Sequence, residues 1–257
     1  MAEYEYITFS DGEVAVLTLN RPEVLNSLNA EMLDEIHQAL DIVRLSQSIR
    51  SLVINGAGRA FCAGWDIGDM GDGSRREVVD VLSDMLRVGQ LATELYSLPK
   101  PVVVAINGVA AGGGCGISLA ADFRVLSEDA KVVFAFINVG FVPDTGTAYF
   151  LPRLVGLAKA KELMMRGQSI DAAEALRLGL ATKVVPAADL QEAALQLATE
   201  LARKPAEAMQ LTKLGANGSL EMDLKAALAY EAAAQMGLSQ SAAHLEAVAQ
   251  FTRKSRR

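Results

Sequence analysis

The sequence has few of the residues that build disulfides, metal centres or membrane segments. Its two cysteines, Cys62 and Cys115, form no CxxC pair and no disulfide framework, so the chain suits a reducing, cytoplasmic compartment. Its two histidines, His37 and His244, have no second ligand at metal-binding spacing, so we expect no metal centre. Proline, glycine or charge interrupts every long apolar stretch, and the N-terminus is acidic, which predicts neither a membrane span nor a signal segment.

Positive charge is also scarce. The 257 residues carry a formal net charge of −7 and contain no long basic run, which argues against nucleic acid as the main partner. A polyanionic small molecule stays possible, because local patches bind such ligands. Hydrophobic residues make up 51% of the chain, which is ample for the buried core of one large domain or of a domain with an appendage.

Apolar patterning predicts strands that alternate with helices up to about residue 186, and helices alone after it. The expected strands are residues 4–10, 13–19, 50–55, 102–107, 123–129, 131–136 and 181–186. The expected helices are residues 30–46, 76–97, 157–166, 171–177, 189–203, 205–215, 221–236 and 240–254, with one more that begins within the glycines after residue 107. The C-terminal helices must bury their apolar faces, for which another subunit would provide a surface.

Two glycine-rich turns follow predicted strands. The first, NGAGRAFCAGWDIGDM (55–70), has Phe61 where a dinucleotide fingerprint needs a third small residue, and the second, NGVAAGGGCGISLA (107–120), lacks the Lys-Ser/Thr of a P-loop. Both turns expose backbone N–H groups, and the second does so where a helix begins and its dipole favours negative charge. One N–H from each turn would make an oxyanion hole. Close packing of helix on strand is the alternative that these glycines leave open.

One carboxylate, Asp144, lies in the stretch GFVPDTGTAYF (140–150), which is otherwise apolar, small or hydroxylic. Pro-Asp-x-Gly is ordinary turn chemistry, because proline presets φ and aspartate bonds its own backbone. Alternatively, apolar neighbours hold the carboxylate so that it can transfer protons. The stretch by itself is compatible with both interpretations.

Taken together, these motifs resemble the crotonase, or enoyl-CoA hydratase/isomerase, superfamily. The resemblance runs from LTLNRPEVLNSLNAEM through GAGRAFCAGWDI, KPVVVAINGVAAGGGCGISLAADFRV and GFVPDTGTAYFLPRLVG to FTRK near the end. It implies an α/β fold in which a spiral of repeated strand–strand–helix units (residues 1–195) carries the acyl-CoA site. A C-terminal helical trimerisation region (residues 196–257) would follow. The resemblance further implies trimers or hexamers, acyl-CoA thioester substrates, and no cofactor beyond the coenzyme A of the substrate.

The resemblance also assigns roles to individual residues. It implies that the backbone N–H groups of Trp65 and Gly113 form the oxyanion hole. Contacts to the substrate and its coenzyme A are expected from Asn26, Ser27, Leu28, Trp65, Asp66, Ile67, Gly68, Gly113 and Phe136. Near the C-terminus, Phe251 and Lys254 fit the family's contact to coenzyme A, which is often made across a subunit boundary; a solvated basic tail is the alternative for Lys254.

Two departures from the family pattern bear on the reaction. Hydratases of the family use two glutamates, and the matching positions here are Gly116 and Phe136. Adding water needs a matched pair of acid–base groups, whereas shifting a double bond needs one base and an oxyanion hole. The segment around Asp144 most resembles the ring-opening enoyl-CoA isomerases of phenylacetate degradation, in which an aspartate directly after this proline is the catalytic acid/base. Its pKa is expected to be raised by Phe134, Phe136, Phe141 and Val142.

Other functions stay open at this point. One is an enoyl-CoA hydratase with unusual acid–base groups, and another is a non-catalytic acyl-CoA-binding oligomer. Aryl-CoA dehalogenases also carry an aspartate here, but they use a histidine and a tryptophan at positions that are Gly89 and Phe136 in this chain. Several conspicuous residues are expected to be structural: the buried fillers Cys62 and Cys115, the loop residue Asp66, and Asp122 near a helix end.

Overall fold

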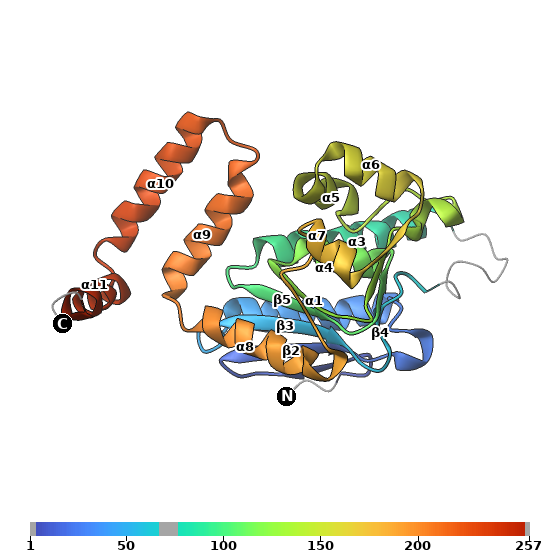
Figure 1. Ribbon diagram of the computed structural model, residues 1–257, viewed down its shortest axis with the longest axis horizontal. Coiled ribbons are helices and arrows are strands. Elements are labelled where there is room, and N and C mark those ends of the chain that lie inside the picture. The colour runs from blue at the N-terminus through green and yellow to red at the C-terminus, as the bar shows by residue number, and fades with distance from the viewer. Residues whose placement is uncertain (1–3, 67–76, 255–257) are drawn as a thin grey trace.

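The computed structural model describes residues 4–66 and 77–254, and a six-stranded sheet lies at its centre (Figure 1). The sheet has the order β1-β2-β3-β5-β7-β10. Its strands are β1 (Ile7–Ser10), β2 (Val14–Leu19), β3 (Ser51–Gly56), β5 (Val102–Ile106), β7 (Phe123–Ser127) and β10 (Lys183–Val185). Only β1 and β2 pair antiparallel among these strands. All residues of β3 and β5 are buried, which explains why both read as continuous apolar runs.

A second sheet of four short strands, in the order β4-β6-β8-β9, lies beside the first. Its strands are β4 (Ala60–Cys62), β6 (Val109–Ala111), β8 (Lys131–Val133) and β9 (Ser169–Asp171). Each of the successive pairs β3–β4, β5–β6 and β7–β8 gives its first strand to the larger sheet and its second to the smaller one. A helix follows each pair, so the chain advances in strand–strand–helix units.

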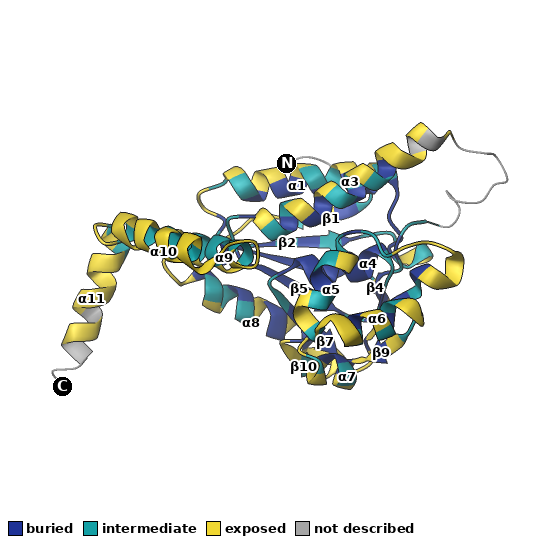
Figure 2. Ribbon diagram, turned by 90° about the horizontal axis from the view of Figure 1, so that it is seen from above, coloured by how far each residue is buried: buried dark blue, intermediate teal, exposed yellow. Residues whose placement is uncertain are grey.

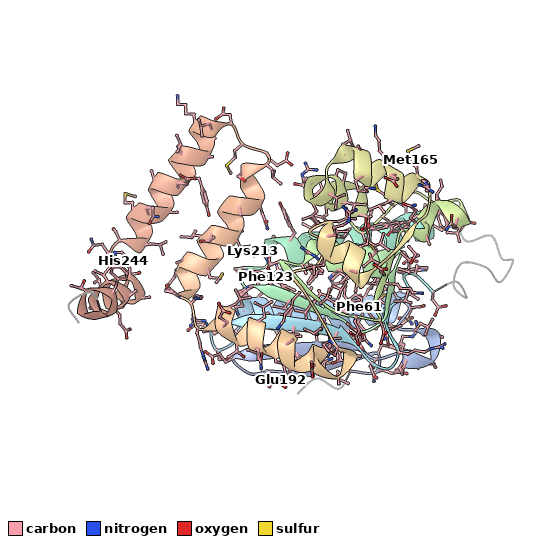
Figure 3. All side chains as sticks on the ribbon, in the orientation of Figure 1. Phe61, Phe123, Met165, Glu192, Lys213 and His244 are labelled. Carbon is pink, nitrogen blue, oxygen red and sulfur yellow. The ribbon has the colours of Figure 1, made fainter. Side chains whose placement is uncertain are left out.

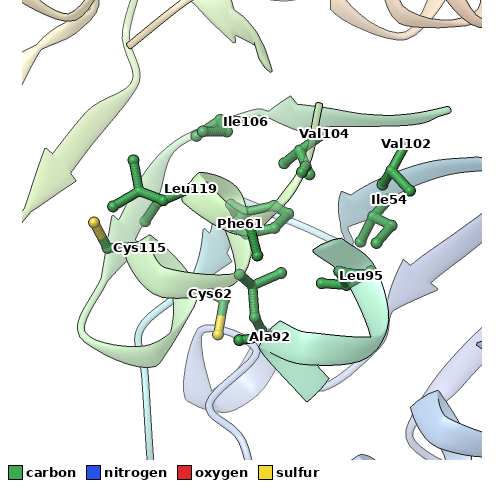
Figure 4. Packing of buried hydrophobic residues seen from close by; sticks show 14 of the residues in the cluster. Ile54, Phe61, Cys62, Ala92, Leu95, Val102, Val104, Ile106, Cys115 and Leu119 are labelled. Atoms are coloured by element: carbon green, nitrogen blue, oxygen red, sulfur yellow. The ribbon is translucent and has the colours of Figure 1, made fainter. Parts of the chain in front are cut away.

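Helices cover both faces of the larger sheet (Figure 2). One face packs against α1 (Ala30–Leu45), α3 (Val78–Ser97) and α4 (Gly113–Ala120). Figure 4 shows part of this core, in which Phe61, Leu95 and Val104 pack together. The other face packs against alanines of α8 (Leu190–Ala202). The outer helices of the core are α5 (Thr147–Val155), α6 (Leu157–Met165) and α7 (Ala172–Arg177), with the short 3-10 helices η1 (Pro22–Val24), η2 (Ala135–Val139) and η3 (Ala187–Asp189).

Three helices leave the core as an arm: α9 (Ala206–Ser219), α10 (Leu224–Leu238) and α11 (Ala242–Lys254) (Figure 1). Lys213 is the buried residue of α9, and α10, which is described throughout, has none. The predicted division after residue 195 falls inside α8. Because α8 packs on the sheet through Ala193, Ala194 and Ala198, the arm begins with α9.

The strand predicted over residues 131–136 is too long. Strand β8 ends at Val133, which pairs with Ser169, the first residue of β9. After one more backbone bond, from the Phe134 N–H to the Gln168 oxygen (2.9 Å), residues Ala135–Val139 form η2, so Phe136 lies on a 3-10 helix and not on a strand. The structure confirms the other predicted strands within a few residues of their expected ends. It also confirms the helices predicted over 30–46 and 157–166, those from 171 onward, and the helix that begins within the glycines.

Candidate functional site

The second glycine turn ends where α4 begins. Gly112 has φ 52° and ψ −125°, a conformation that suits glycine, and α4 starts at Gly113. The first N–H groups of a helix have no partner within it and carry the positive end of its dipole. In the described part of the chain, the Gly113 N–H donates no hydrogen bond. This N–H is therefore available to a negatively charged atom.

The first glycine turn meets the second one backbone to backbone. A Cβ atom at Gly64 would lie 3.2 Å from the Gly113 nitrogen and 3.0 Å from the Ala111 oxygen. Trp65 follows and forms a parallel bridge with Leu28, in which the Leu28 N–H donates to the Gly64 oxygen (2.7 Å) and the Asp66 N–H donates to the Leu28 oxygen (2.9 Å). The Trp65 N–H consequently points away from Leu28, and it has no hydrogen-bond partner among the described residues. The turns thus present the two N–H groups that the resemblance implies.

Asp144 lies in the loop before α5. The Thr147 N–H donates to the Asp144 carbonyl oxygen (2.8 Å), which closes a turn, and the Thr145 hydroxyl donates to Asp144 Oδ1 (2.8 Å). Burial raises the pKa of the Asp144 carboxyl, while the Thr145 hydroxyl and the backbone N–H of Asp144 oppose that shift. The structure therefore confirms the turn, and it shows a partly buried carboxyl group at Asp144, as a proton-transferring residue would require.

Two observations place Asp144 beside the first turn of α4. Burial raises the pKa of the Cys115 thiol on α4, and the charge of Asp144 adds to that increase. A Cβ at Gly113 would lie 3.3 Å from the Thr145 hydroxyl oxygen, which itself bonds the Asp144 carboxylate. The fold thus brings together three residues that the sequence singled out, namely Trp65, Gly113 and Asp144.

Two of the four apolar residues expected around Asp144 are buried, and one of them, Phe136, lies near the second glycine turn. Phe134 and Phe136 are buried, and the Phe136 ring lies 4.0 Å from the place of a Cβ at Gly112. Phe141 and Val142 are 52% and 79% exposed, so the prediction that they bury the Asp144 carboxylate is wrong for the single chain. Both residues follow Gly140, whose left-handed conformation ends η2.

Asn26 holds the first glycine turn in place through hydrogen bonds. Its side-chain nitrogen donates to the oxygens of Ala57 (2.9 Å) and Ala60 (2.8 Å), and its side-chain oxygen accepts from the Arg21 N–H (2.9 Å). The Arg21 guanidinium in turn forms an ion pair with Asp66 (3.0 Å), which fits the expected orienting role of Asp66. The Asn26 amide is fully buried, so it shapes the loop.

The neighbouring residues of the predicted coenzyme A loop are also buried. The Ser27 hydroxyl donates to the Val24 oxygen (2.8 Å). The Leu28 side chain is fully buried and reaches within 3.2 Å of the place of a Cβ at Gly113. The predicted contacts at Ile67 and Gly68 lie outside the described residues.

The C-terminal residues of the predicted site lie elsewhere. Phe251 is on α11, at the far end of the arm from the glycine turns, and is 74% exposed (Figures 1 and 2). Lys254 is the last residue of α11, and its side chain is not described. Within one chain, the fold does not bring Phe251 to the site.

Sequence reasoning missed Thr145 and Arg21 as parts of the site. A hydroxyl residue directly after the candidate carboxylate was the available signal for Thr145.

Among residues 4–66 and 77–254, no group of three or more His, Cys, Asp or Glu side chains is arranged to hold a metal ion. Over the same ranges, no helix is both long and apolar enough to cross a bilayer.

Comparisons with known proteins agree with this architecture. The family described as "Enoyl-CoA hydratase/isomerase" matches residues 10–256. A "Probable enoyl-CoA hydratase" of Rhodobacter capsulatus is 39% identical over 98% of this chain and 96% of its own length. The "1,2-epoxyphenylacetyl-CoA isomerase" of Escherichia coli K12 is 38% identical over 94% of this chain and 92% of its own.

The fold is likewise shared with solved structures. The crystal structure of an enoyl-CoA hydratase from Bacillus anthracis superposes with a TM-score of 0.93 at 32% identity, covering 97% of each chain. Sequence and structure agree over nearly the whole length, as the motifs predicted. The chain therefore belongs to the enoyl-CoA hydratase/isomerase family and has the crotonase fold.

Proposed function

We propose that the protein is an enoyl-CoA isomerase, in which Asp144 is the single proton carrier. The observation that carries the proposal is that this partly buried carboxylate accepts from the Thr145 hydroxyl, which lies next to Gly113 and its unpartnered N–H. Its substrate would be a 3-enoyl-CoA or a ring-type phenylacetyl-CoA derivative. The name of the Escherichia coli relative, an acyl-CoA isomerase, supports the same reaction class.

The reaction needs only these groups. The thioester oxygen binds against the N–H groups of Trp65 and Gly113. Asp144 removes a proton from C2, and the electron pair of that bond enters a dienolate whose negative charge rests on the thioester oxygen. Asp144 then returns the proton to C4, and a double bond forms between C2 and C3. Each N–H donor contributes about 3 kcal/mol to such a step, and no electron is gained or lost, so no metal or redox cofactor is required.

The two positions that carry glutamates in the family's hydratases support isomerisation. Gly116 has no side chain, and Phe136 places a ring near the start of α4, so neither offers a group to activate water. Hydration is the second candidate, because the Rhodobacter capsulatus relative bears the name of a probable hydratase. In that case another group would have to activate water.

The arm suggests how the remaining coenzyme A contacts are made. Large apolar side chains of α10 and α11 are exposed in the single chain, including Leu224 (75%), Met236 (74%) and Phe251 (74%). Burial of this surface in a homotrimer or hexamer would remove it from water. The same assembly would carry Phe251 and Lys254 to the substrate of another subunit.

The test follows the conversion of a 3-enoyl-CoA to the conjugated 2-enoyl-CoA by ultraviolet absorbance. We expect the wild type to convert it and Asp144→Asn to lose about 100-fold or more in kcat, which is the usual loss of a general base. The matched control is Asp129→Asn, which replaces a surface-exposed aspartate and should behave as wild type. Hydration of crotonyl-CoA that survives in Asp144→Asn, without isomerisation in the wild type, would establish the hydratase instead.

A further inference from the structure

Thr145 has an unusual backbone for its residue type. Its φ is +49°, in the left-handed region that a β-branched residue rarely adopts, and only 3% of the residue is exposed. Such a conformation persists where the surroundings hold it in place, and it is concentrated at functional sites. Its two neighbours in the chain are Asp144 and Gly146, the latter also left-handed (φ 73°).

The hydroxyl of Thr145 is committed to the carboxylate of Asp144. The oxygen-to-oxygen distance from Thr145 Oγ1 to Asp144 Oδ1 is 2.8 Å. The same hydroxyl lies beside Gly113, because a Cβ there would be 3.3 Å from it. One side chain therefore contacts both the candidate base and the helix start that carries a candidate oxyanion donor.

The rest of the Thr145 side chain fills the space next to Gly116. A Cβ at Gly116 would lie 2.5 Å from Thr145 Cβ, 2.6 Å from its carbonyl oxygen and 2.9 Å from its Cγ2. Real Cβ atoms do not approach other atoms so closely, so any side chain at position 116 would force the loop to move. Gly116 and Thr145 are thus sterically matched.

From this geometry we propose that Thr145 is a positioning residue for Asp144, and that its packing against Gly116 closes the site to a second acid–base side chain. The inference rests on the proposed isomerase function. The hydrogen bond fixes Oδ1 and leaves Oδ2 to exchange the proton with C2 and C4. The methyl group and backbone of Thr145 occupy the room that a glutamate at position 116 would need. One residue thereby orients the single base and excludes a second one.

The first test separates the hydroxyl from the shape of the side chain. Thr145→Val keeps the branched shape and loses the hydroxyl, whereas Thr145→Ser keeps the hydroxyl. We expect kcat for 3-enoyl-CoA isomerisation to fall about tenfold to a hundredfold in Thr145→Val, with KM little changed, and to recover in Thr145→Ser. Thr8→Val, on the exposed side of β1, is the control for the substitution itself.

A pH profile gives a readout that a purely structural role would not move. Because the hydroxyl stabilises the ionised carboxylate, Thr145→Val should raise the pKa of Asp144 and shift the acid limb of kcat/KM to higher pH. The charge of Asp144 adds to the raised pKa of Cys115 on α4, which burial already raises, so this thiol stays neutral on that limb.

The second test is independent of activity. Gly116→Ala should lower the urea midpoint strongly, and adding Thr145→Gly should recover part of that loss, because it removes two of the three clashing atoms. Strictly additive losses would refute the steric match. A wild type without isomerase activity would instead refute the proposed function. An active wild type with an inactive Asp144→Asn and an unimpaired Thr145→Val would refute the positioning role alone.

Discussion

Two aspartates lie at opposite ends of α4, and burial raises the pKa of both. Asp122 follows the C-terminal end, where its Oδ2 accepts from Lys213 Nζ (2.8 Å) and from the Val102 N–H (2.8 Å). Asp144 lies at the N-terminal end, where the Thr145 hydroxyl and the backbone N–H of Asp144 itself donate to it. A buried cation therefore compensates one carboxylate, whereas the groups that compensate the other within residues 4–66 and 77–254 are neutral.

The difference supports the roles proposed for the two carboxylates, which are structural for Asp122 and proton-transferring for Asp144. A cation and a backbone donor both stabilise the ionised form of a carboxylate, which makes it a poor proton carrier in a reaction. A carboxylate that is buried among neutral groups has a raised pKa with no compensating charge, which makes it a stronger base once it is ionised. The surroundings, and not the residue type, therefore favour Asp144 over Asp122 as the proposed base.

The paired aspartate also holds the arm to the core. Lys213 projects from α9 toward the core (Figure 3), where its ammonium also donates to the oxygens of Leu95 (3.0 Å) and Lys100 (3.2 Å). Burial lowers the pKa of Lys213, and Asp122 counters that shift. This one side chain therefore satisfies three acceptors of the core at the base of the arm.

Lys213→Met gives the largest expected effect on stability. It leaves the Asp122 charge buried without its cation, which typically costs about 3–5 kcal/mol of the free energy of unfolding. Urea denaturation at fixed protein concentration measures the loss. Lys225→Met, on the exposed surface of α10, is the matched control and should change the midpoint little.

A second variant tests whether the loss comes from the orphaned charge. Replacing both partners, as Asp122→Leu with Lys213→Met, should restore much of the stability, since an apolar pair has no charge to desolvate. A double variant that is less stable than Lys213→Met would contradict this account of the C-terminal end of α4.

The N-terminal end of α4 should tolerate added volume poorly. A Cβ at Gly114 would lie 2.3 Å from the Cys62 oxygen and 2.7 Å from the Cys62 Cβ. We expect Gly114→Ala to cost about 1–3 kcal/mol, because the neighbouring backbone has no free space. The matched control is Gly89→Ala within α3, where a Cβ meets nothing within 4 Å. That variant should gain about 0.5–1 kcal/mol, so thermal unfolding should move in opposite directions for the two.

The sequence predicted most of the elements around α4 but not the groups that hydrogen-bond the two aspartates at its ends. The apolar runs of β3 and β5 and the glycines that start α4 have strong local patterns, and the structure confirms them. The strands β4 and β6 were missed because each lies within a stretch that its glycines mark as a turn, and β9 was missed because only one of its three residues is buried. Helix α5 was not predicted because Pro152 lies inside it, and a proline usually ends a helix.

Side-chain partners were harder to predict than elements. The pairing of Asp122 with Lys213 joins residues that are far apart in the chain, and an isolated lysine in an alanine-rich helix reads as solvated. The left-handed Thr145 depends on Gly116 in the same way, through a contact that no local pattern encodes. Both contacts arise from the tertiary fold, so they required the structure.

The smallest expected effect comes from the buried charge of Asp144. A carboxyl whose pKa is higher in the folded than in the unfolded chain contributes stability below its unfolded pKa, about 4, and that contribution is lost as the pH rises through the folded pKa. At pH 7 the buried Asp144 charge therefore costs stability, and Asp144→Asn, which stays neutral, should be more stable than the wild type. The gain should disappear as the pH falls below about 4. Urea midpoints of the wild type and Asp144→Asn, measured from about pH 3 to pH 7, test both the gain and its disappearance. A loss of stability in Asp144→Asn at neutral pH would mean that Asp144, like Asp122, serves the fold, and the contrast between the two ends of α4 would no longer identify the base.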